Sequence, residues 1–364
     1  MHMFYKITKE SYKERLDGMP QFHMQKPKRV AILTVVIVAV LAVVFTSFFY
    51  LNSQNAYTGK TENMSFGTFL GSSEPYAALV YVAQDQHFFA QNGINLTITD
   101  YTSATNALNS ALSGQVNLAI SSEYAFVATN VLKQGNLHII ATIDKSQSVS
   151  IVGRKDSGIE NKSDLQGKRI GLTLQIAPQF YLATFLELNN VNTQNITLVN
   201  VPTTEYVPAI VNGTVDAVVV SESFIPQIEA HLPNDTVMWS AQSGQLLDMV
   251  VSCTNDWIVQ HPELAIRFLR SLDQAGAYVV NHPTQAEAIV QKRLNTTDAY
   301  MAEIWSNHQF SLSLDQSLVV AMEDESRWMI SNNLTNVTNV PNFLNYIYLN
   351  GLMSVKPESV DIIH

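Results

Sequence analysis

Hydroxyl and carboxylate side chains occur together at short turns of this chain. The stretch Phe69–Gly93 (FLGSSEPYAALVYVAQDQHFFAQNG) places Gly71, Ser72, Ser73 and Glu74 directly before an apolar helical segment. A serine in that position can cap a helix by accepting hydrogen bonds from free backbone N–H groups. The same oxygens can also form one wall of a site that hydrogen-bonds a small polar ligand.

Residue types that support covalent or metal chemistry are few or unsuitably spaced. The single cysteine, Cys253, lies in the apolar run MVVSCTND, which is typical of a buried inert thiol, and it excludes an intramolecular disulfide. The histidines His87, His138 and His282 show no spacing with acids or cysteine that indicates a metal site. The strand-end loops contain no Gly-x-Ser-x-Gly turn. We therefore predict no catalytic residue, no metal and no cofactor.

Alternating strands and helices must hold the polar turns in place, and such alternation predicts parallel sheets covered by helices on both faces. The predicted strands are Ser65–Leu70, Ile94–Thr99, Val116–Ser121, Leu137–Ile143, Val149–Arg154, Arg169–Leu174, Ile196–Val201 and Ala217–Ser221. The predicted helices between them are Tyr76–Gln91, Ala104–Leu112, Glu123–Lys133, Gln179–Leu188, Thr204–Val211 and Phe224–His231.

After about residue 255 the pattern becomes helical, with no strand between the helices. We expect this region to pack back on the earlier part of the chain. The predicted helices are Pro262–Asn281, Thr284–Leu294, Asp298–His308 and Leu314–Ile330.

A long apolar run stands near the N-terminus. Val30–Leu51 holds 22 residues without a charge, enough for a helix to cross the hydrocarbon core of a bilayer. The alternative is a cleavable signal peptide, but the run exceeds the usual apolar core and no small-x-small cleavage site follows it. Residues 1–29 carry seven Lys/Arg against three acids, so the positive-inside bias predicts a cytoplasmic tail and an extracytoplasmic main domain.

The part beyond the apolar run is acidic. Removing the tail's seven basic and three acidic residues from the chain's 21 and 31 leaves 14 and 28, a formal charge of −14. That charge excludes nucleic acid as a partner on electrostatic grounds. The same part holds nine N-x-S/T sequons, which favour an extracytoplasmic surface.

Five blocks resemble, in order and spacing, the solute-binding proteins that serve ABC importers, in the group that binds nitrate, taurine, alkanesulfonates and thiamine-pyrimidine precursors. The resemblance covers about residues 64–295. The blocks are HFFAQNGINLTI (His87–Ile98), LSGQVNLAIS (Leu112–Ser121), SGIENKSDLQGKRIGLTL (Ser157–Leu174), IVNGTVDAVVVSESF (Ile210–Phe224) and QHPELAIRFLRSL (Gln260–Leu272).

The resemblance implies an α/β, two-lobed fold of the type II periplasmic-binding-protein class, with two crossover strands and the ligand between the lobes. Together with the apolar run, it predicts five parts. They are a basic cytoplasmic tail (1–29), a transmembrane anchor (30–51), a linker (52–63), lobe one (64–148 plus 249–364) and lobe two with the crossover (149–248).

Ligands of such sheets bind beyond the carboxyl ends of the strands, near helix N-termini. The resemblance thereby singles out four turns, and each serine or threonine there is either a cap or a ligand contact. Aromatic side chains near them suit a flat or cationic ligand, or else belong to the core. The predicted ligand-binding residues are Ser72, Ser73, Glu74, Tyr76, Ser121, Ser122, Glu123, Tyr124, Thr173, Gln175, Ser221, Glu222 and Trp239.

The charges at these turns bear on the ligand. Glu74, Glu123 and Glu222 follow three of the serine-bearing turns, and Lys145 is the only base nearby. Carboxylates facing one cleft repel an anion, so we expect a cationic or donor-rich ligand in preference to sulfonate or nitrate. The alternative is that these acids only favour the dipoles of the helices that they begin.

The resemblance predicts a membrane-tethered, extracytoplasmic receptor that delivers a small organic molecule to an ABC permease and its ATPase. The main alternative is an enzyme of the same fold that acts on a thiamine-pyrimidine-like precursor, which needs a cofactor lysine or an activated nucleophile in the cleft. A membrane-bound sensor is a third reading, but the 29-residue tail leaves no room for an output domain.

The charge asymmetry around residues 30–51 generates a topology prediction. Protease added to intact cells should digest residues 52–364 and spare only the N-terminal tail, as an epitope placed at each end can report. A soluble mature protein that starts after Leu51 would contradict the anchor and indicate a cleaved signal.

Overall fold

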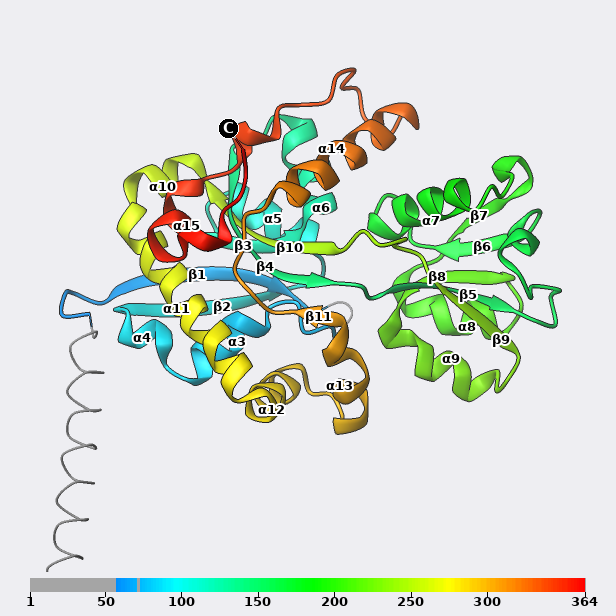
Figure 1. The fold of residues 1–364 in the computed structure, drawn as a ribbon, viewed down its shortest axis with the longest axis horizontal. Helices are drawn as coiled ribbons and strands as arrows, with labels where there is room; N and C mark the ends of the chain where they lie inside the picture. The colour runs from blue at the N-terminus through cyan, green and yellow to red at the C-terminus, as the bar shows by residue number, and fades with distance from the viewer. Residues whose placement is uncertain (1–56, 71–72, 364) are drawn as a thin grey trace, which may run out of the picture. The chain divides into compact units, whose positions relative to one another are not determined.

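The computed structural model describes residues 57–70 and 73–363, which form two β-sheets with helices around them (Figure 1). The strand order is β11-β4-β10-β3-β1-β2 in the first sheet and β7-β6-β8-β5-β9 in the second. The strands are β1 (Glu62–Phe69), β2 (Ile94–Tyr101), β3 (Leu118–Ser122), β4 (Leu137–Ser146), β5 (Val149–Arg154), β6 (Arg169–Leu172), β7 (Thr197–Asn200), β8 (Ala217–Ser221), β9 (Thr236–Ser240), β10 (Leu247–Thr254) and β11 (His308–Gln309).

Both sheets are mixed, so the prediction of purely parallel sheets is wrong. Strand β1 runs parallel to β2 and β3, and β6 runs parallel to β7 and β8. Strand β10 is antiparallel to β3 and β4, and β5 is antiparallel to β8 and β9. The reason is that β5 and β10 enter their sheets from the passages between the sheets, so they run away from the edge at which the parallel strands end.

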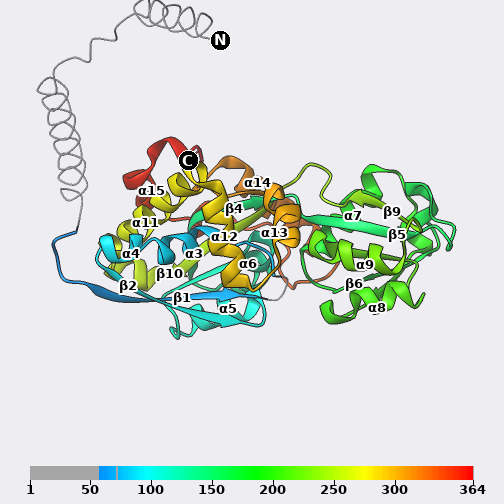
Figure 2. The same cartoon turned by 90° about the horizontal axis from the view of Figure 1, so that it is seen from below.

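Helices cover each sheet, and Figure 2 shows them from below. In the first lobe α11 packs on α3, α4, α12 and α15, and α5 packs on β1 and β3; in the second, α8 packs on β6 and β8. The helices are α3 (Ala78–Asp85), α4 (Phe88–Gln91), α5 (Ala104–Leu112), α6 (Glu123–Thr129), α7 (Ala177–Leu188), α8 (Tyr206–Val211), α9 (Ile225–His231), α10 (Asn255–Gln260), α11 (Pro262–Asn281), α12 (Pro283–Leu294), α13 (Asp298–Ile304), α14 (Gln316–Ser331) and α15 (Leu349–Val355).

Three local predictions differ from the structure. The helix expected over Tyr76–Gln91 is broken at His87, whose φ of 59° is left-handed, so it becomes α3 and α4. The helix expected over Asp298–His308 ends at Ile304, which frees His308 to join β11. Strand β9 was not predicted, since its half-exposed residues lack the long apolar run of a central strand.

The C-terminal region packs back on the first lobe as predicted, but the prediction that it contains no strand is wrong, because β11 lies between α13 and α14 and pairs with β4. Helix α11 begins with a proline at its first position, where the missing N–H costs no hydrogen bond. It lies against α3 and α4, while α14 lies against α6 and α15 against β4. The region after residue 255 therefore completes the first lobe.

The chain passes between the sheets twice, through residues 147–148 and 241–246. The Gln242 side chain ties the two passages together. Its Oε1 accepts the N–H groups of Ser148 (2.7 Å) and Val149 (2.9 Å), and its Nε2 donates to the carbonyl of Ser146 (2.9 Å). Because Gln242 is buried, these bonds hold the passages in fixed register.

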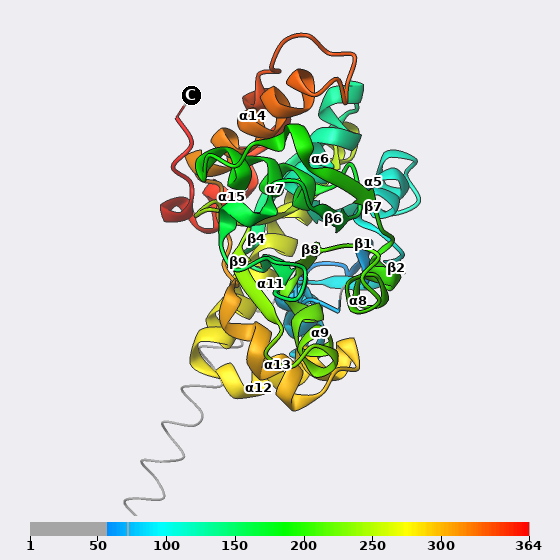
Figure 3. The ribbon, with the colours of Figure 1, turned by 90° about the vertical axis from the view of Figure 1, so that its right-hand side faces the viewer.

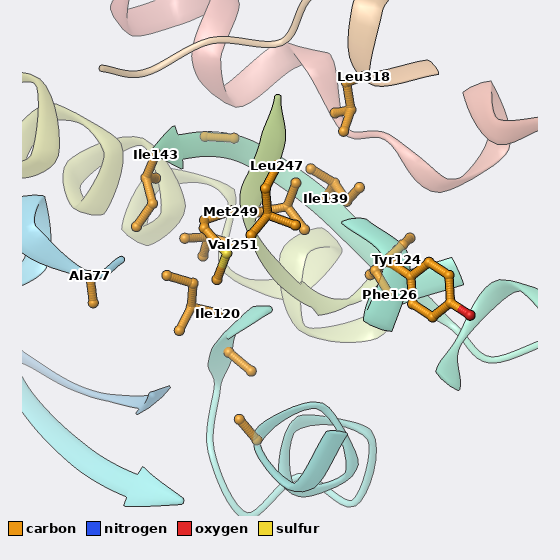
Figure 4. Close-up of a cluster of buried hydrophobic side chains, with 14 of the residues drawn as sticks. Ala77, Ile120, Tyr124, Phe126, Ile139, Ile143, Leu247, Met249, Val251 and Leu318 are labelled. Carbon is orange, nitrogen blue, oxygen red and sulfur yellow. The ribbon is translucent and has the colours of Figure 1, made fainter. Parts of the chain in front are cut away.

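Two apolar clusters form the interior. One extends through the first lobe, where Ile143 of β4 and Met249 and Val251 of β10 meet (Figure 4), and continues to the α7 face of the second sheet. The other fills the α8 and α9 face of the second sheet, around Val218 and Ile210. The run AVVVS of β8 is buried on both faces, as a β-branched central strand should be.

The predicted tail, the predicted anchor and residues 52–56 of the predicted linker lie outside the described residues. Strand β1 begins at Glu62, inside the predicted linker (52–63). Among residues 57–70 and 73–363, no helix is long and apolar enough to cross a bilayer.

The packing of α11 generates a stability prediction. Phe268 is fully buried, and its ring stacks on Phe66 (5.9 Å) and Phe89 (5.5 Å). Phe268→Ala should lower the free energy of unfolding by about 3–5 kcal/mol because it leaves a cavity. Val280→Ala, at an exposed position of the same helix, should change it by less than about 0.5 kcal/mol in the same urea titration. Equal effects of the two substitutions would contradict this packing.

Candidate functional site

A cleft of about 320 Å³ lies between the sheets, at the carboxyl ends of strands β1, β2, β3, β6, β7 and β8. This is the position where α/β sheets of this kind bind ligands. Figure 3 views the molecule from the side of the second sheet. The cleft is lined by Phe69, Tyr76, Thr102–Thr105, Ser122, Tyr124, Ala125, Ala128, Thr129, Val149, Thr173, Gln175–Pro178, Thr203, Tyr206, Val220, Ser221, Phe224, Leu247 and Met249.

Serines at the cleft combine two roles. Ser122 caps α6 by accepting the N–H of Ala125 (3.1 Å), and Ser103 caps α5 by accepting the N–H of Asn106 (3.2 Å). Both residues also line the cleft. The two roles are therefore compatible, since a serine that caps a helix still has its hydroxyl at the cleft surface.

Aromatic rings from both lobes face the cleft. Tyr76 packs beside Phe69 on the first lobe (5.9 Å), and Tyr206 meets Phe224 edge to face on the second (5.4 Å, 82°). The Tyr206 hydroxyl bonds to Thr173 Oγ1 (2.8 Å), which fixes the ring. Rings on opposite walls suit a flat ligand held between them.

Sequence reasoning missed several of these residues. The residues Thr102–Thr105, Thr203, Tyr206 and Phe224 lie after β2, β7 and β8. The available signal was that β2 and β7 also end in turns at the same sheet edges. The missed rings carry no sequence motif of their own, because Tyr206 and Phe224 resemble ordinary core residues until their neighbours are known.

Among the described residues that line the cleft, none carries a carboxylate, amine, guanidinium, imidazole or thiol. Its titratable side chains are the phenols of Tyr76, Tyr124 and Tyr206. Burial raises the pKa of Tyr76 and of Tyr124, so both phenols stay protonated at neutral pH. The surface is therefore uncharged, with hydroxyl and amide groups between apolar side chains.

This composition corrects the sequence-based charge argument. Glu74, Glu123 and Glu222 do not line the cleft, and the first two are buried. Lys145 does not line it either, since its ammonium pairs with Asp248 (3.2 Å) and Asp315 (2.6 Å). The three acids turn inward because hydrogen-bond donors and cations in the interior satisfy them. The structure therefore gives no support for direct contact between these acids and a ligand.

Glu74 belongs to a network that joins the lobes. Its Oε1 accepts the hydroxyl of Ser221 from the second lobe (2.6 Å), and its Oε2 lies 3.2 Å from His308 Nε2. His308 Nδ1 lies 2.8 Å from Asp144 Oδ2. Burial alone lowers the pKa of His308, but the two carboxylates raise it to about 10, so the imidazole is protonated at neutral pH.

Glu123 belongs to a second buried group at the junction. Its Oε1 accepts the hydroxyl of Tyr181 on α7 (3.4 Å), and its Oε2 accepts the N–H of Asp248 (3.0 Å). Glu325 of α14 is fully buried beside Glu123 and Asp248. Burial, followed by repulsion from these two acids, raises the pKa of Glu325 well above its ordinary value.

The other predicted site residues lie outside the cleft or at its edge. Glu222 accepts hydrogen bonds from Ser150 (3.1 Å) and from Asn307 of the first lobe (2.6 Å). Trp239 of β9 packs against Phe185, away from the cleft lining. Ser121 is fully buried in β3, behind the cleft surface.

The remaining residues divide between the cleft, its surroundings and the undescribed part. Gln175 lines the cleft with a left-handed backbone (φ 63°), an arrangement that recurs at functional sites in residues other than glycine. Ser73 is left-handed as well (φ 56°), and its carbonyl accepts the hydroxyl of Tyr300 (3.4 Å). Ser72 lies outside the described residues.

A family model described as "NMT1/THI5 like" matches residues 74–286, more than half of the chain. The chain belongs to the NMT1/THI5-like family. The resemblance to solute-binding proteins found in the sequence is thereby confirmed at the level of the family, and this family membership covers most of the cleft.

The NMT1/THI5-like chain has relatives with different names. It is 26% identical over 228 residues to a Haemophilus influenzae protein named for thiamine biosynthesis, covering 61% of this chain and 71% of that one. It is 23% identical over 222 residues to the 4-amino-5-hydroxymethyl-2-methylpyrimidine phosphate synthase of Legionella pneumophila, covering 59% and 68%.

A solved structure confirms the fold. The periplasmic aliphatic sulphonate binding protein SsuA from Escherichia coli superposes with a TM-score of 0.67 at 12% identity, covering 79% of this chain and 92% of that one. At this identity the likeness extends to the two-lobed periplasmic-binding-protein fold and no further.

The Glu325 environment generates a pH prediction. When the pKa of an acid is higher in the folded than in the unfolded state, the free energy of unfolding falls as pH rises between these two pKa values. The fall is up to ~1.4 kcal/mol per pH unit. Glu325→Gln cannot ionise, so its free energy of unfolding should fall less than that of the wild type between pH 5 and pH 8, in urea titrations. The contribution of His308 is common to both proteins and cancels in the difference.

Glu323→Gln is the matched control, because Glu323 lies on α14 and pairs with Arg327 at the surface. It should retain the pH dependence of the wild type. Parallel curves for Glu325→Gln and the wild type would show that Glu325 is not held protonated by the fold.

Proposed function

We propose that this protein is a membrane-tethered, extracytoplasmic receptor that closes its two lobes on a small organic molecule and delivers it to an ABC import permease. The observation that carries the proposal is the uncharged cleft between the sheets, built from turns of both lobes. Its described lining offers no general base or nucleophile stronger than a hydroxyl or phenol, and such a surface binds without converting.

The ligand class follows from the same lining. Rings on both walls favour a flat ligand, and the absence of charge among the described lining residues favours a neutral one. Serine, threonine and glutamine side chains supply the polar contacts. An aminopyrimidine fits these requirements better than a sulfonate or nitrate ion, whose charge finds no cationic side chain there.

Delivery to a permease and tethering are supported more indirectly. The fold matches a periplasmic sulphonate-binding protein, and residues 30–51 have the composition of a membrane-spanning helix. The basic N-terminal tail favours an orientation that places the cleft outside the cytoplasm.

An enzyme of the same fold is the second candidate, because a relative is named as a pyrimidine phosphate synthase. That reading requires chemistry that the described lining does not supply from its own side chains. Incubation of the purified protein with a small-molecule extract of cells, followed by mass spectrometry, separates the two: newly formed aminopyrimidine phosphate supports the enzyme, and the absence of such a product supports the receptor.

Ligand-driven stabilisation tests the receptor. A ligand that binds only the folded state adds about 2.7 kcal/mol at a hundred times its dissociation constant. Thermal unfolding of the full chain with amines, pyrimidines, sulfonates and oxyanions should reveal one class that stabilises it, with a smaller radius of gyration in X-ray scattering. No stabilisation by any class would count against the receptor.

A pair of variants links this stabilisation to the cleft. Phe224→Ala removes a ring from the second-lobe wall and should weaken binding about tenfold. Leu198→Ala, at an exposed position of β7 in the same lobe, should leave binding unchanged. Equal affinity of the two variants would place the ligand outside the cleft.

A further inference from the structure

A polar chain runs from the cleft wall into the first lobe. It begins at Ser221, which ends β8 and lines the cleft, and crosses to Glu74 of the other lobe through a hydrogen bond of 2.6 Å. Beyond Glu74 it continues to His308 and Asp144, whose side chains are fully buried like that of Glu74. A hydroxyl at the cleft is thus connected to a fixed internal ion cluster.

The ion cluster fixes which way each proton points. His308 is protonated, so Nδ1–H donates to Asp144 Oδ2 (2.8 Å) and Nε2–H donates to Glu74 Oε2 (3.2 Å). Glu74 then acts as an acceptor on both oxygens, with Oε1 facing Ser221. A carboxylate cannot donate, so the hydroxyl proton of Ser221 must point to Glu74.

Because its hydroxyl proton points to Glu74, Ser221 can offer only its lone pairs to other groups. The hydrogen bond of the Ser221 hydroxyl is its donation to Glu74 Oε1. A hydroxyl oxygen has two lone pairs, and these remain to face the cleft. Ser221 therefore presents an acceptor to whatever occupies the cleft.

We propose that Ser221 accepts a hydrogen bond from an N–H or O–H group of the ligand, and that Glu74 is the positioning residue that sets this preference without touching the ligand. The inference rests on the proposed receptor function and narrows its ligand to molecules with a donor towards the second lobe. A sulfonate offers only acceptor oxygens, which meet the lone pair of Ser221 unfavourably.

Glu74→Gln tests the inference by reversing the hydrogen bond. His308 Nε2–H still needs an acceptor, so the amide oxygen of the glutamine should face His308 and its NH₂ should face Ser221. Ser221 then accepts from the glutamine and turns its own proton into the cleft. The variant should lose affinity for donor ligands and gain affinity for acceptor ligands, a change of preference that a merely structural role does not produce.

The experiment is calorimetry on the full chain with two probes, 4-amino-5-hydroxymethyl-2-methylpyrimidine as donor and butanesulfonate as acceptor. The wild type should prefer the aminopyrimidine. Glu74→Gln should weaken aminopyrimidine binding about ten- to a hundredfold, because a donor then faces a donor, and the ratio of the two affinities should move towards the sulfonate.

Glu222→Gln is the matched control. Glu222 is adjacent in sequence to Ser221, but its oxygens accept hydrogen bonds from Ser150 and Asn307 instead. This variant should keep the wild-type ratio of affinities. A ratio that shifts equally in both variants would overturn the role of Glu74.

Ser221→Ala covers the case in which Glu74→Gln does not fold. It removes the acceptor and should weaken aminopyrimidine binding about tenfold while leaving butanesulfonate binding unchanged or improved. Unchanged aminopyrimidine affinity in Ser221→Ala would overturn the inference and leave the receptor function standing.

Two results in the wild type separate this inference from the receptor function. Preference for butanesulfonate over the aminopyrimidine would overturn the inference alone, since a bound sulfonate still supports a receptor. Absence of binding by either probe, together with no stabilisation by any class in the thermal series, would overturn both.

Discussion

Ionisable side chains are buried at the junction of the lobes, where they must satisfy one another. Glu74, Asp144 and His308 have fully buried side chains, and an isolated charge in that environment is strongly unfavourable. The three groups satisfy one another in a chain, and Ser221 of the second lobe completes it. The contact between the lobes therefore helps to satisfy this cluster, since Ser221 reaches Glu74 from the second lobe.

The second buried acidic group, formed by Glu123 and Glu325, also contacts the second lobe at this junction. Glu123 and Glu325 lie near Asp248, and Tyr181 of the second lobe donates to Glu123. Trp328, one turn further along α14 than Glu325, packs on Phe180 of the second lobe (5.8 Å). The helical C-terminal region thus reaches across to the second lobe through α14, in addition to completing the first.

Because the acids form hydrogen bonds at the junction of the lobes, they leave the described part of the cleft wall uncharged. Carboxylates that begin helices beside a ligand site can either face the ligand or turn inward, and here donors from the partner lobe draw them inward. The described cleft wall is consequently uncharged, and it presents hydroxyl groups and aromatic rings. A buried charged residue can still set the orientation of a hydroxyl in such a wall, as Glu74 does for Ser221.

Local patterns along the chain predict the alternation of strands and helices, the family resemblance and the turns that meet at the cleft. Tyr76, Ser122, Tyr124, Thr173, Gln175 and Ser221 line the cleft, because the carboxyl ends of parallel strands share one edge of a sheet. Local periodicity and turn chemistry carry that information along a short stretch of chain.

The positions of the charged side chains depend on contacts between elements that are distant in the chain. The pairing of Glu74 with His308 joins residues 234 positions apart, and that of Lys145 with Asp315 joins residues 170 apart. No local pattern signals such a contact. Tyr206 and Phe224 likewise line the cleft because the second sheet places their turns opposite the first sheet. Whether a polar side chain faces a ligand or the interior depends on partners from distant elements, and folding alone supplies them.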